Sequence, residues 1–273
     1  MSDSAPVITL SIDIGSTRTH IAAVDVYKLQ CVDRIDSYND EFDDTFADNI
    51  KKLADAYPQI NRVNITSCVR GLAIKAKEIC DDLSIDPHFD SSVNRDGRRF
   101  ETVELVRPHA RLPVSFNYEE PGTLGTDRIC DALACAAMCK GKSCIIIDVG
   151  TAVTVDYLRD GKAFEGVAIL SGYSMQLDAL HKNTDSLPRI DISTLGDGLN
   201  VSLPSKSTED CIKAGILLGM AGAIDRCIGV CKRNWGKGII VATGGGWEPI
   251  KPSIKHKTIT IPDLTLIGAG IYR

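Results

Sequence analysis

An internal repeat limits the possible folds of this chain more than any other feature of its sequence. The segment Ile12-Asp13-Ile14-Gly15-Ser16-Thr17 is echoed by Ile147-Asp148-Val149-Gly150-Thr151-Ala152. The two aspartates are 148 − 13 = 135 residues apart, about half of the 273 residues. In each copy an apolar, β-rich run ends in Asp-x-Gly-[Ser/Thr], and a second β-rich run follows, as in a hairpin. The repeat therefore predicts two similar lobes that face each other across a cleft.

The residue types of the repeat suit the binding of phosphate. Glycine lets the backbone approach an anion closely, while hydroxyl and N–H groups line the turn. An aspartate at the end of a strand can hold a cation that bridges it to phosphates. Because Asp-x-Gly is common, two unrelated hairpin turns are the alternative. The half-chain spacing and a third glycine-rich strand end, Thr243-Gly244-Gly245-Gly246, favour the phosphate-binding interpretation.

The rest of the chain alternates between helix and strand patterns. Apolar residues at spacings of three and four predict helices over residues 41–56, 72–83, 124–139 and 207–230. Runs rich in β-branched residues predict strands over residues 62–69, 143–148, 153–157, 163–169 and 238–242. This alternation predicts an α/β fold, and we place its two lobes at residues 1–115 and 116–273.

Charge and composition exclude several classes of protein. Lys plus Arg is 31 and Asp plus Glu is 36, so the net charge of −5 disfavours non-specific binding to duplex nucleic acid. Apolar runs stay below the length of a membrane span, about 18 residues, and the N-terminus lacks the features of a signal peptide. We therefore expect a cytoplasmic protein whose ten cysteines are reduced thiols. The pairs Cys135/Cys139 and Cys227/Cys231 leave a zinc site open, but small buried hydrophobes are the preferred interpretation.

Several familiar catalytic motifs are missing from the sequence. Gly141-Lys142-Ser143 is not a P-loop, because Ala136 stands where that motif has its first glycine and a strand, rather than a helix, follows. The sequence also has no GxGxxG, GxSxG or HExxH motif. Any phosphate chemistry therefore depends on the repeated hairpins.

Six short motifs, in order along residues 8–246, resemble those of the bacterial type III pantothenate kinases. They are Asp13-Ile14-Gly15-Ser16-Thr17-Arg18, Leu124-Gly125-Thr126-Asp127-Arg128, Asp148-Val149-Gly150-Thr151-Ala152, Thr184-Asp185-Ser186-Leu187-Pro188, Ser207-Thr208-Glu209 with Gly215 and Gly219, and Ala242-Thr243-Gly244-Gly245. The resemblance implies the two-lobed fold of the actin-like ATPases, which is ribonuclease H-like. In this fold, two duplicated lobes of the βββαβα type enclose a nucleotide cleft. It also implies a homodimer that transfers the γ-phosphoryl group of ATP to pantothenate, the first step of coenzyme A biosynthesis.

The same resemblance implies a role for each matching residue. The residues that would bind ATP are Asp13, Ile14, Gly15, Ser16, Thr17, Arg18, Thr19 and His20 of the first hairpin, and Thr151 of the second. Asp13 would lie near Mg²⁺, and Asp148 would hold a monovalent cation, K⁺ or NH₄⁺. Asp127 would be the catalytic base. Those that would line the pantothenate site are Tyr118, Gly125, Thr126, Asp127 and Arg128, with Thr184 reaching it from the partner subunit.

The chemistry of these side chains fits the implied roles, although each has a simpler structural alternative. Phosphoryl transfer needs positioning and charge stabilisation, and a carboxylate can accept the proton of the attacking hydroxyl. An arginine fork matches the carboxylate that pantothenate carries. The structural alternatives are a helix cap for Asp127, a surface ion pair for Arg128, packing for Tyr118, turn caps for Asp148 and Thr184, and a hairpin position for His20.

The chain departs from the family pattern in three places. Ser16 stands where the family usually has Asn, and Asp131 stands where the family often has Asn. Residues 165–172 differ from the usual Gly-Gly-x-Ile-x-Pro-Gly, and Glu165 replaces a glycine of that motif. One alternative is therefore a catalytically weak or inactive nucleotide-binding relative with a regulatory role. Another is a different kinase or phosphatase of the same superfamily, against which Tyr118 and residues 125–128 weigh. The intact Asp127 and Arg128 favour the pantothenate kinase.

Overall fold

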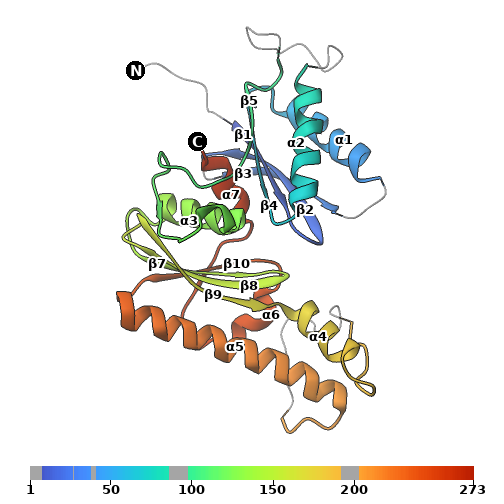
Figure 1. Cartoon of the computed structure of the whole chain (residues 1–273), viewed down its shortest axis with the longest axis vertical. Coiled ribbons are helices and arrows are strands. Elements are labelled where there is room, and N and C mark those ends of the chain that lie inside the picture. Colours follow the sequence, from blue (N-terminus) through green and yellow to red (C-terminus); the bar gives the residue numbers. More distant parts are fainter. Residues whose placement is uncertain (1–7, 27, 38–40, 86–97, 192–202) are drawn as a thin grey trace. The chain divides into compact units, whose positions relative to one another are not determined.

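The chain folds into two compact units. The computed structural model describes residues 8–26, 28–37, 41–85, 98–191 and 203–273. The first unit comprises residues 1–138 together with 263–273, and the second comprises residues 139–262. Each unit is described by itself below, and Figure 1 gives the elements of both.

The first unit contains a five-stranded sheet. Its strands are β1 (Ile8–Ile14), β2 (Arg18–Asp25), β3 (Lys28–Asp36), β4 (Arg62–Ser67) and β5 (Thr102–Leu105), in the order β3-β2-β1-β4-β5. Strand β2 is antiparallel to both β1 and β3, whereas β4 pairs parallel with β1 and β5 pairs parallel with β4. The helices are α1 (Phe42–Ala56), α2 (Arg70–Ile85), α3 (Thr126–Met138) and α7 (Leu264–Ile271), and the short elements are β6 (Ser115–Phe116) and η1 (Pro121–Thr123).

The two faces of this sheet are covered differently, as the period of two along β1 requires. Its isoleucine and leucine side chains pack with Phe46 of α1 and Ala76 of α2 in one apolar core. The residues between them are small and polar, and α7 lies on that side, opposite α1 and α2 (Figure 1). A Cβ atom added to Gly270 of α7 would come within 3.2 Å of Ser11 Oγ, and Asn64 Nδ2 donates to the carbonyl of Ala269. Small residues on both elements therefore allow the close packing of α7 on the sheet.

The second unit repeats the strand arrangement of the first. Five of its strands are β7 (Cys144–Val149), β8 (Ala152–Arg159), β9 (Ala163–Ser171), β10 (Ile239–Thr243) and β11 (Ile259–Thr260), in the order β11-β10-β7-β8-β9. As in the first unit, three antiparallel strands are followed by two that run parallel to the first of them. This correspondence between β1 and β7 confirms the duplication that the repeat predicts. The helical elements of the unit are α4 (Tyr173–Lys182), α5 (Thr208–Trp235), α6 (Trp247–Ile250) and η3 (Lys251–Ser253).

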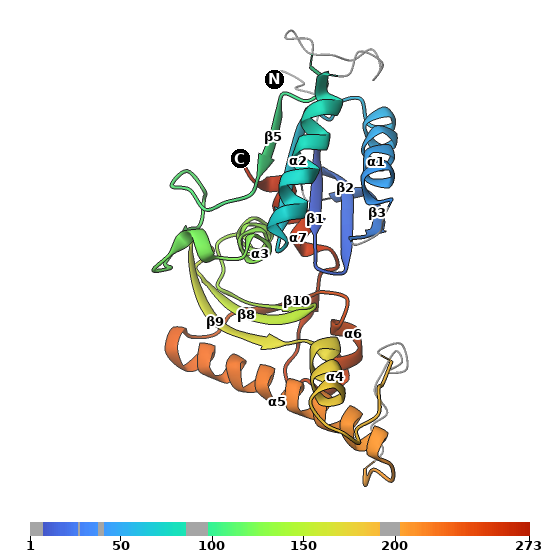
Figure 2. The ribbon, with the colours of Figure 1, turned by 45° about the vertical axis from the view of Figure 1, so that its right-hand side comes forward.

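The longest helix of the second unit, α5, covers one face of its sheet (Figure 2). Ser207 caps its N-terminus by accepting a hydrogen bond from the backbone N–H of Asp210, and Gly236 follows its C-terminus with a φ of 94°. Ile216, Met220 and Ile224 pack with the strands in the core. Within the described residues, α5 is the one helix long and apolar enough to cross a membrane, and its buried face is that of a core helix.

The division into compact units differs from the lobes expected at residues 1–115 and 116–273. Helix α3 and the C-terminal α7 both belong to the first unit, because they pack on each other. Thr265 Oγ1 donates to Asp131 Oδ1 at 2.8 Å in a buried contact, and a Cβ atom on Gly268 would overlap the carbonyl group of Cys130. The sequence order cannot reveal that the chain returns to its first unit after residue 262.

Candidate active site

The loop between β1 and β2 is a tight turn that a residue outside the motif holds in place. The N–H of Gly15 donates to the carbonyl of Arg18 at 2.9 Å, and a Cβ atom on Gly15 would lie 3.0 Å from that oxygen. Ser37, just after β3, donates through Oγ to the carbonyl of Gly15 at 2.8 Å and pairs with Thr19 Oγ1 at 3.0 Å. Thr19 is buried, so its hydroxyl serves this internal network, whereas Thr17 is exposed. The sequence analysis missed Ser37, because nothing local marks a contact over 22 residues.

The first turn of α3 is fixed to the end of β4 by Thr126. Its Oγ1 accepts hydrogen bonds from Thr66 Oγ1 at 2.8 Å and from the N–H of Ser67 at 2.9 Å, and it donates to the carbonyl of Ser67 at 3.1 Å. Thr66 is the parallel partner of Asp13 on β1. Thr126 therefore holds the next residue, Asp127, at the end of the sheet where β1 also ends.

Asp13 and Asp127 lie close to the same thiol at this end of the sheet. Burial raises the pKa of Cys68, and the carboxylates of Asp127 and Asp13 raise it further. Asp127 is half-buried in the first turn of α3, and its Oδ1 accepts a hydrogen bond from the N–H of Arg128 at 2.8 Å. A Cβ atom on Gly125 would come within 2.5 Å of that carboxylate oxygen, so a glycine gives Asp127 its space.

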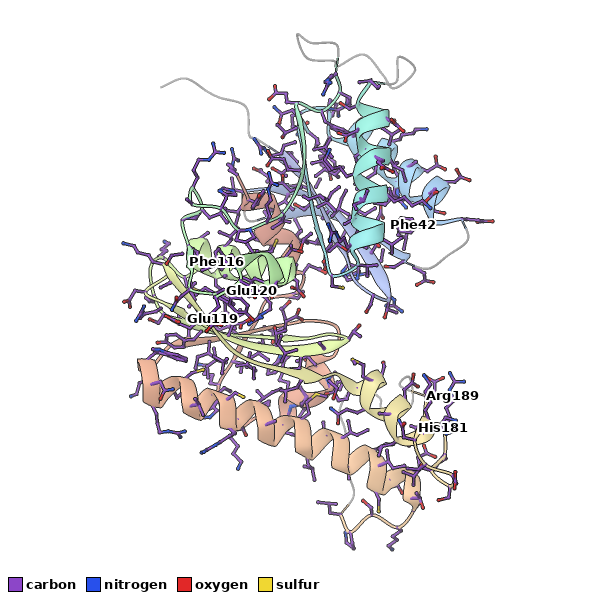
Figure 3. All side chains as sticks on the ribbon, viewed as in Figure 1. Phe42, Phe116, Glu119, Glu120, His181 and Arg189 are labelled. Atoms are coloured by element: carbon purple, nitrogen blue, oxygen red, sulfur yellow. The ribbon has the colours of Figure 1, made fainter. Side chains whose placement is uncertain are left out.

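Arg128 and Tyr118 form a pair beside Asp127. Arg128 Nη1 donates to Tyr118 Oη at 3.2 Å, and the guanidinium carbon lies 5.7 Å from the centre of the ring. Arg128 is 5% exposed, which contradicts its structural alternative as a surface ion pair. Tyr118 follows β6 and is next to Glu119 and Glu120, which lead into η1 (Figure 3). A buried cation with a phenol ring suits the recognition of a carboxylate by a planar fork.

His20 lies on β2 as the antiparallel partner of Asp13 on β1, near the start of α7. Its Nδ1 is 3.8 Å from Asp263 Oδ1, and Arg34 Nη2 is 3.3 Å from the same oxygen. Burial lowers the pKa of His20. The negative charge of Asp263 raises this pKa in part, whereas the positive charges of Arg34 and Arg18 lower it further. The imidazole is therefore neutral at pH 7, and its partners in the structure belong to α7 and β3.

In the second unit, three chain segments meet around Asp148 at the end of β7. Gly244, with a φ of +89°, follows β10, and a Cβ atom there would lie 2.3 Å from Asp148 Oδ1. The N–H of Gly246 donates to the carbonyl of Val149 at 2.8 Å. Gly172 donates its N–H to the carbonyl of Thr151 at 2.9 Å and has no room for a side chain against the β7–β8 turn. The glycine-rich strand end at residues 243–246 therefore packs against the second hairpin.

Thr184 caps the end of α4. Its Oγ1 donates to the carbonyl of Leu180 at 2.7 Å, and His181 Nδ1 is 3.0 Å from the carbonyl of Leu187. Figure 3 labels His181 and Arg189, which come from the end of α4 and from the segment that follows it. Thr184 is exposed. Within one chain, the contacts of Thr184 are those of the structural alternative, a capping residue.

The donors in the two hairpins fit the cations of ATP chemistry. Mg²⁺ is usually held by one or two carboxylates together with substrate phosphates, and Asp13 near the end of β1 supplies one carboxylate of this kind. The carboxylate of Asp148 and the carbonyl of Val149 both lie against Gly244, and they offer oxygen atoms of the kind that a monovalent cation binds. No group of three or more His, Cys, Asp and Glu side chains is placed to hold a metal ion in the described part of the chain. In that part of the chain, Cys135 and Cys231 are buried free thiols, as expected if they serve as small apolar side chains.

Comparison with known proteins agrees with this arrangement. The family model described as type III pantothenate kinase matches residues 9–229. A type III pantothenate kinase of Fervidobacterium nodosum is 30% identical over 237 residues, which cover 86% of this chain and 86% of the relative.

Two solved structures share the fold. The activator of the 2-hydroxyisocaproyl-CoA dehydratase from Clostridium difficile, with bound ADPNP, has a TM-score of 0.52 at 17% identity, covering 97% of this chain and 93% of that one. The ROK hexokinase from Thermus thermophilus has a TM-score of 0.53 at 12% identity, covering 97% of each chain. These similarities show the two-lobed fold of actin-like ATPases and sugar kinases. Because the family model covers most of the sequence, the chain belongs to the type III pantothenate kinase family.

Proposed function

We propose that this pantothenate kinase uses Asp127 as the base that accepts the proton of the attacking pantothenate hydroxyl. The main support for this proposal is the position of the carboxylate. Thr126 holds it at the end of the sheet where β1 and β4 end, and Gly125 leaves room for it. A primary hydroxyl is a weak nucleophile, so a carboxylate beside it assists its attack on the γ-phosphorus of ATP. The product is 4'-phosphopantothenate.

Arg128 and Tyr118 bind the other end of pantothenate in this proposal. The guanidinium pairs with the carboxylate of the substrate, and the ring of Tyr118 packs beside it. Their mutual hydrogen bond and the burial of Arg128 support a preformed site, because a fixed arginine loses little freedom when it binds. Gly125 and Thr126 then act on the pantothenate site by positioning Asp127.

ATP is held by the two hairpins. Residues 13–20 form the loop that binds the phosphates, with Ser16 in place of the usual Asn and Thr17 exposed, whereas the buried Thr19 supports the loop through Ser37. Thr151 of the second hairpin also contacts ATP in this proposal. Asp13 binds Mg²⁺, which neutralises charge on the phosphates when it is bound. Nucleotide binding by a related fold, in the dehydratase activator with ADPNP, supports this assignment.

The competing proposal is a catalytically weak or inactive nucleotide-binding relative with a regulatory role. The two differ in turnover, so an assay of ADP release with pantothenate, Mg²⁺ and K⁺ separates them. The kinase releases ADP only when pantothenate is present, whereas the inactive relative binds ATP and releases none. The preformed pair of Arg128 and Tyr118 beside Asp127 favours the kinase.

We expect activity to depend on K⁺ or NH₄⁺, and Asp148→Ala to weaken that dependence. The carboxylate lies in contact range of the glycine turn after β10, where a monovalent cation can sit between protein oxygens and phosphate. The measurement is the rate of ADP release in buffers containing only Na⁺, K⁺ or NH₄⁺. Asp48→Ala, a change on the exposed face of α1, is the control and should keep the wild-type dependence. Equal rates of the wild type in Na⁺ and K⁺ would disprove the cation site.

Assembly is a separate part of the proposal: a cytoplasmic homodimer in which Thr184 completes the partner's pantothenate site, without nucleic-acid or membrane partners. Exposed apolar side chains on α4 and α5, namely Met175 at 50% and Leu218 at 46%, support a two-fold contact through these helices. The exposure of Thr184 supports its availability to a partner chain.

Complementation tests the shared site. Asp127→Asn chains are mixed with Thr184→Arg chains, each inactive as a homodimer, and subunit exchange is checked by native mass spectrometry. A heterodimer has one site whose Asp127 and Thr184 are both unmutated, so random pairing should restore about a quarter of the wild-type activity. If exchange occurs and no activity returns, Thr184 does not act across the interface.

A further inference from the structure

A basic cavity lies at the beginning of β10. Its volume is about 390 Å³, within the range of small-molecule pockets, and its lining is mainly carbon, to which the side chains of Lys232, Lys237, His256 and Lys257 contribute. No acidic residue lines it, although acidic residues outnumber basic ones in the whole chain by 36 to 31. The side chains around the cavity are therefore basic, although the protein as a whole carries a net negative charge.

Lys232 and His256 are in contact at the cavity. Lys232 Nζ lies 3.1 Å from His256 Nδ1 in a half-buried position. The contact holds the two side chains together beside the cavity. In the part of the chain that the structure describes, no carboxylate forms an ion pair with Lys232, Lys237 or Lys257. Their positive charges are thus available to an anionic ligand.

The remaining lining gives the cavity an apolar side. Ile239 and Ile259 contribute to the wall, and Ile259 is 51% exposed, so its side chain is accessible to a ligand. A ligand that meets both kinds of wall has a compact charged group and a small apolar part. Lysine is a common point-charge partner of phosphate, and the clustering of three of them favours a doubly charged group.

The cavity is separate from the proposed ATP site. Strand β10 starts beside the C-terminal end of α5, at the cavity, and its other end leads to the glycine turn beside Asp148 (Figure 1). None of the residues assigned to ATP or pantothenate lines the cavity. We propose that this cavity is a second anion site that binds a phosphate monoester with a small apolar substituent.

Imidazole NMR tests the proposal on the full chain. Long-range ¹H–¹⁵N spectra are recorded while inorganic phosphate or butyl phosphate is added, and His256→Asn identifies the His256 signals. We expect both ligands to shift the His256 signals and butyl phosphate to saturate at the lower concentration. Binding at the ATP site alone would leave His256 unchanged.

Matched variants make the result decisive. Lys232→Gln together with Lys257→Gln should raise the dissociation constant of butyl phosphate about tenfold or more, because two charged donors are lost. Lys182→Gln, which removes an exposed lysine paired with Asp178 on α4, should leave it unchanged. Retained pantothenate-dependent ADP release shows that the double variant is folded. An unshifted His256, equal binding in all variants, or equal affinity for the two ligands would each overturn the proposal.

Discussion

Asp127→Asn is expected to fold like the wild type and to lose about 10²–10⁴-fold in kcat, the usual effect of removing a general base. The asparagine keeps the size of the side chain and an oxygen that can accept the hydrogen bond from the N–H of Arg128. What it loses is the capacity to take a proton from the pantothenate hydroxyl. The measurement is the rate of ADP release at saturating ATP and pantothenate, with thermal unfolding as the test of folding.

Asp48→Asn provides the matched control for this experiment. It makes the same chemical change at an exposed position of α1, and it should leave both the rate and the unfolding temperature unchanged. If Asp127→Asn keeps the wild-type kcat, the carboxylate acts only as a cap of α3 and the assignment of the base is wrong.

The largest expected effect on stability comes from Gly268→Ala. A Cβ atom at this position of α7 would lie 1.9 Å from the carbonyl oxygen of Cys130, which is backbone of α3 and cannot move aside as a side chain can. The helices must therefore separate, at a cost of about 3 kcal/mol or more in the free energy of unfolding. Urea denaturation followed by circular dichroism measures this loss.

Gly71→Ala separates the effect of crowding from that of replacing glycine as such. Gly71 lies in α2 of the same unit, and a Cβ atom there would meet nothing within 4 Å. Since alanine favours helix over glycine, this variant should be unchanged or more stable by up to about 1 kcal/mol. If Gly268→Ala is as stable as Gly71→Ala, then α7 does not pack on α3 as described.

The repeated hairpins could be predicted from the sequence because each is a local pattern. An apolar strand, an Asp-x-Gly turn and a second strand are visible in residues that are neighbours in the chain, and β1–β2 and β7–β8 follow them. The sequence does not predict strand β3 in the same way, because its apolar and polar residues do not alternate strictly: Asp33 and Arg34 are two charged residues in succession. Helix α7 was missed for a different reason. It has only eight residues, and nearly all are buried, so it shows no amphipathic period.

The candidate site could be predicted only in part. The types of residue in Gly125-Thr126-Asp127-Arg128 point to acid–base chemistry and carboxylate binding, but no local pattern shows that Asp13 and Asp127 lie near one thiol. Thr126 illustrates the limit. The motif implies a place in the substrate site, whereas its hydroxyl forms three hydrogen bonds with the end of β4. The contact between Thr126 and Ser67 joins residues 59 positions apart in the chain. Such a contact depends on the tertiary fold and produces no local pattern in the sequence.

The most direct test of the proposed chemistry is to identify the product. The chain is incubated with ATP, pantothenate, Mg²⁺ and K⁺, and phosphorylated pantothenate and ADP are quantified by mass spectrometry, with Asp127→Asn in parallel. We predict equimolar 4'-phosphopantothenate and ADP from the wild type, and about 10²–10⁴-fold less of both from the variant. ADP without phosphorylated pantothenate, or ATP binding without either product, would contradict the assignment.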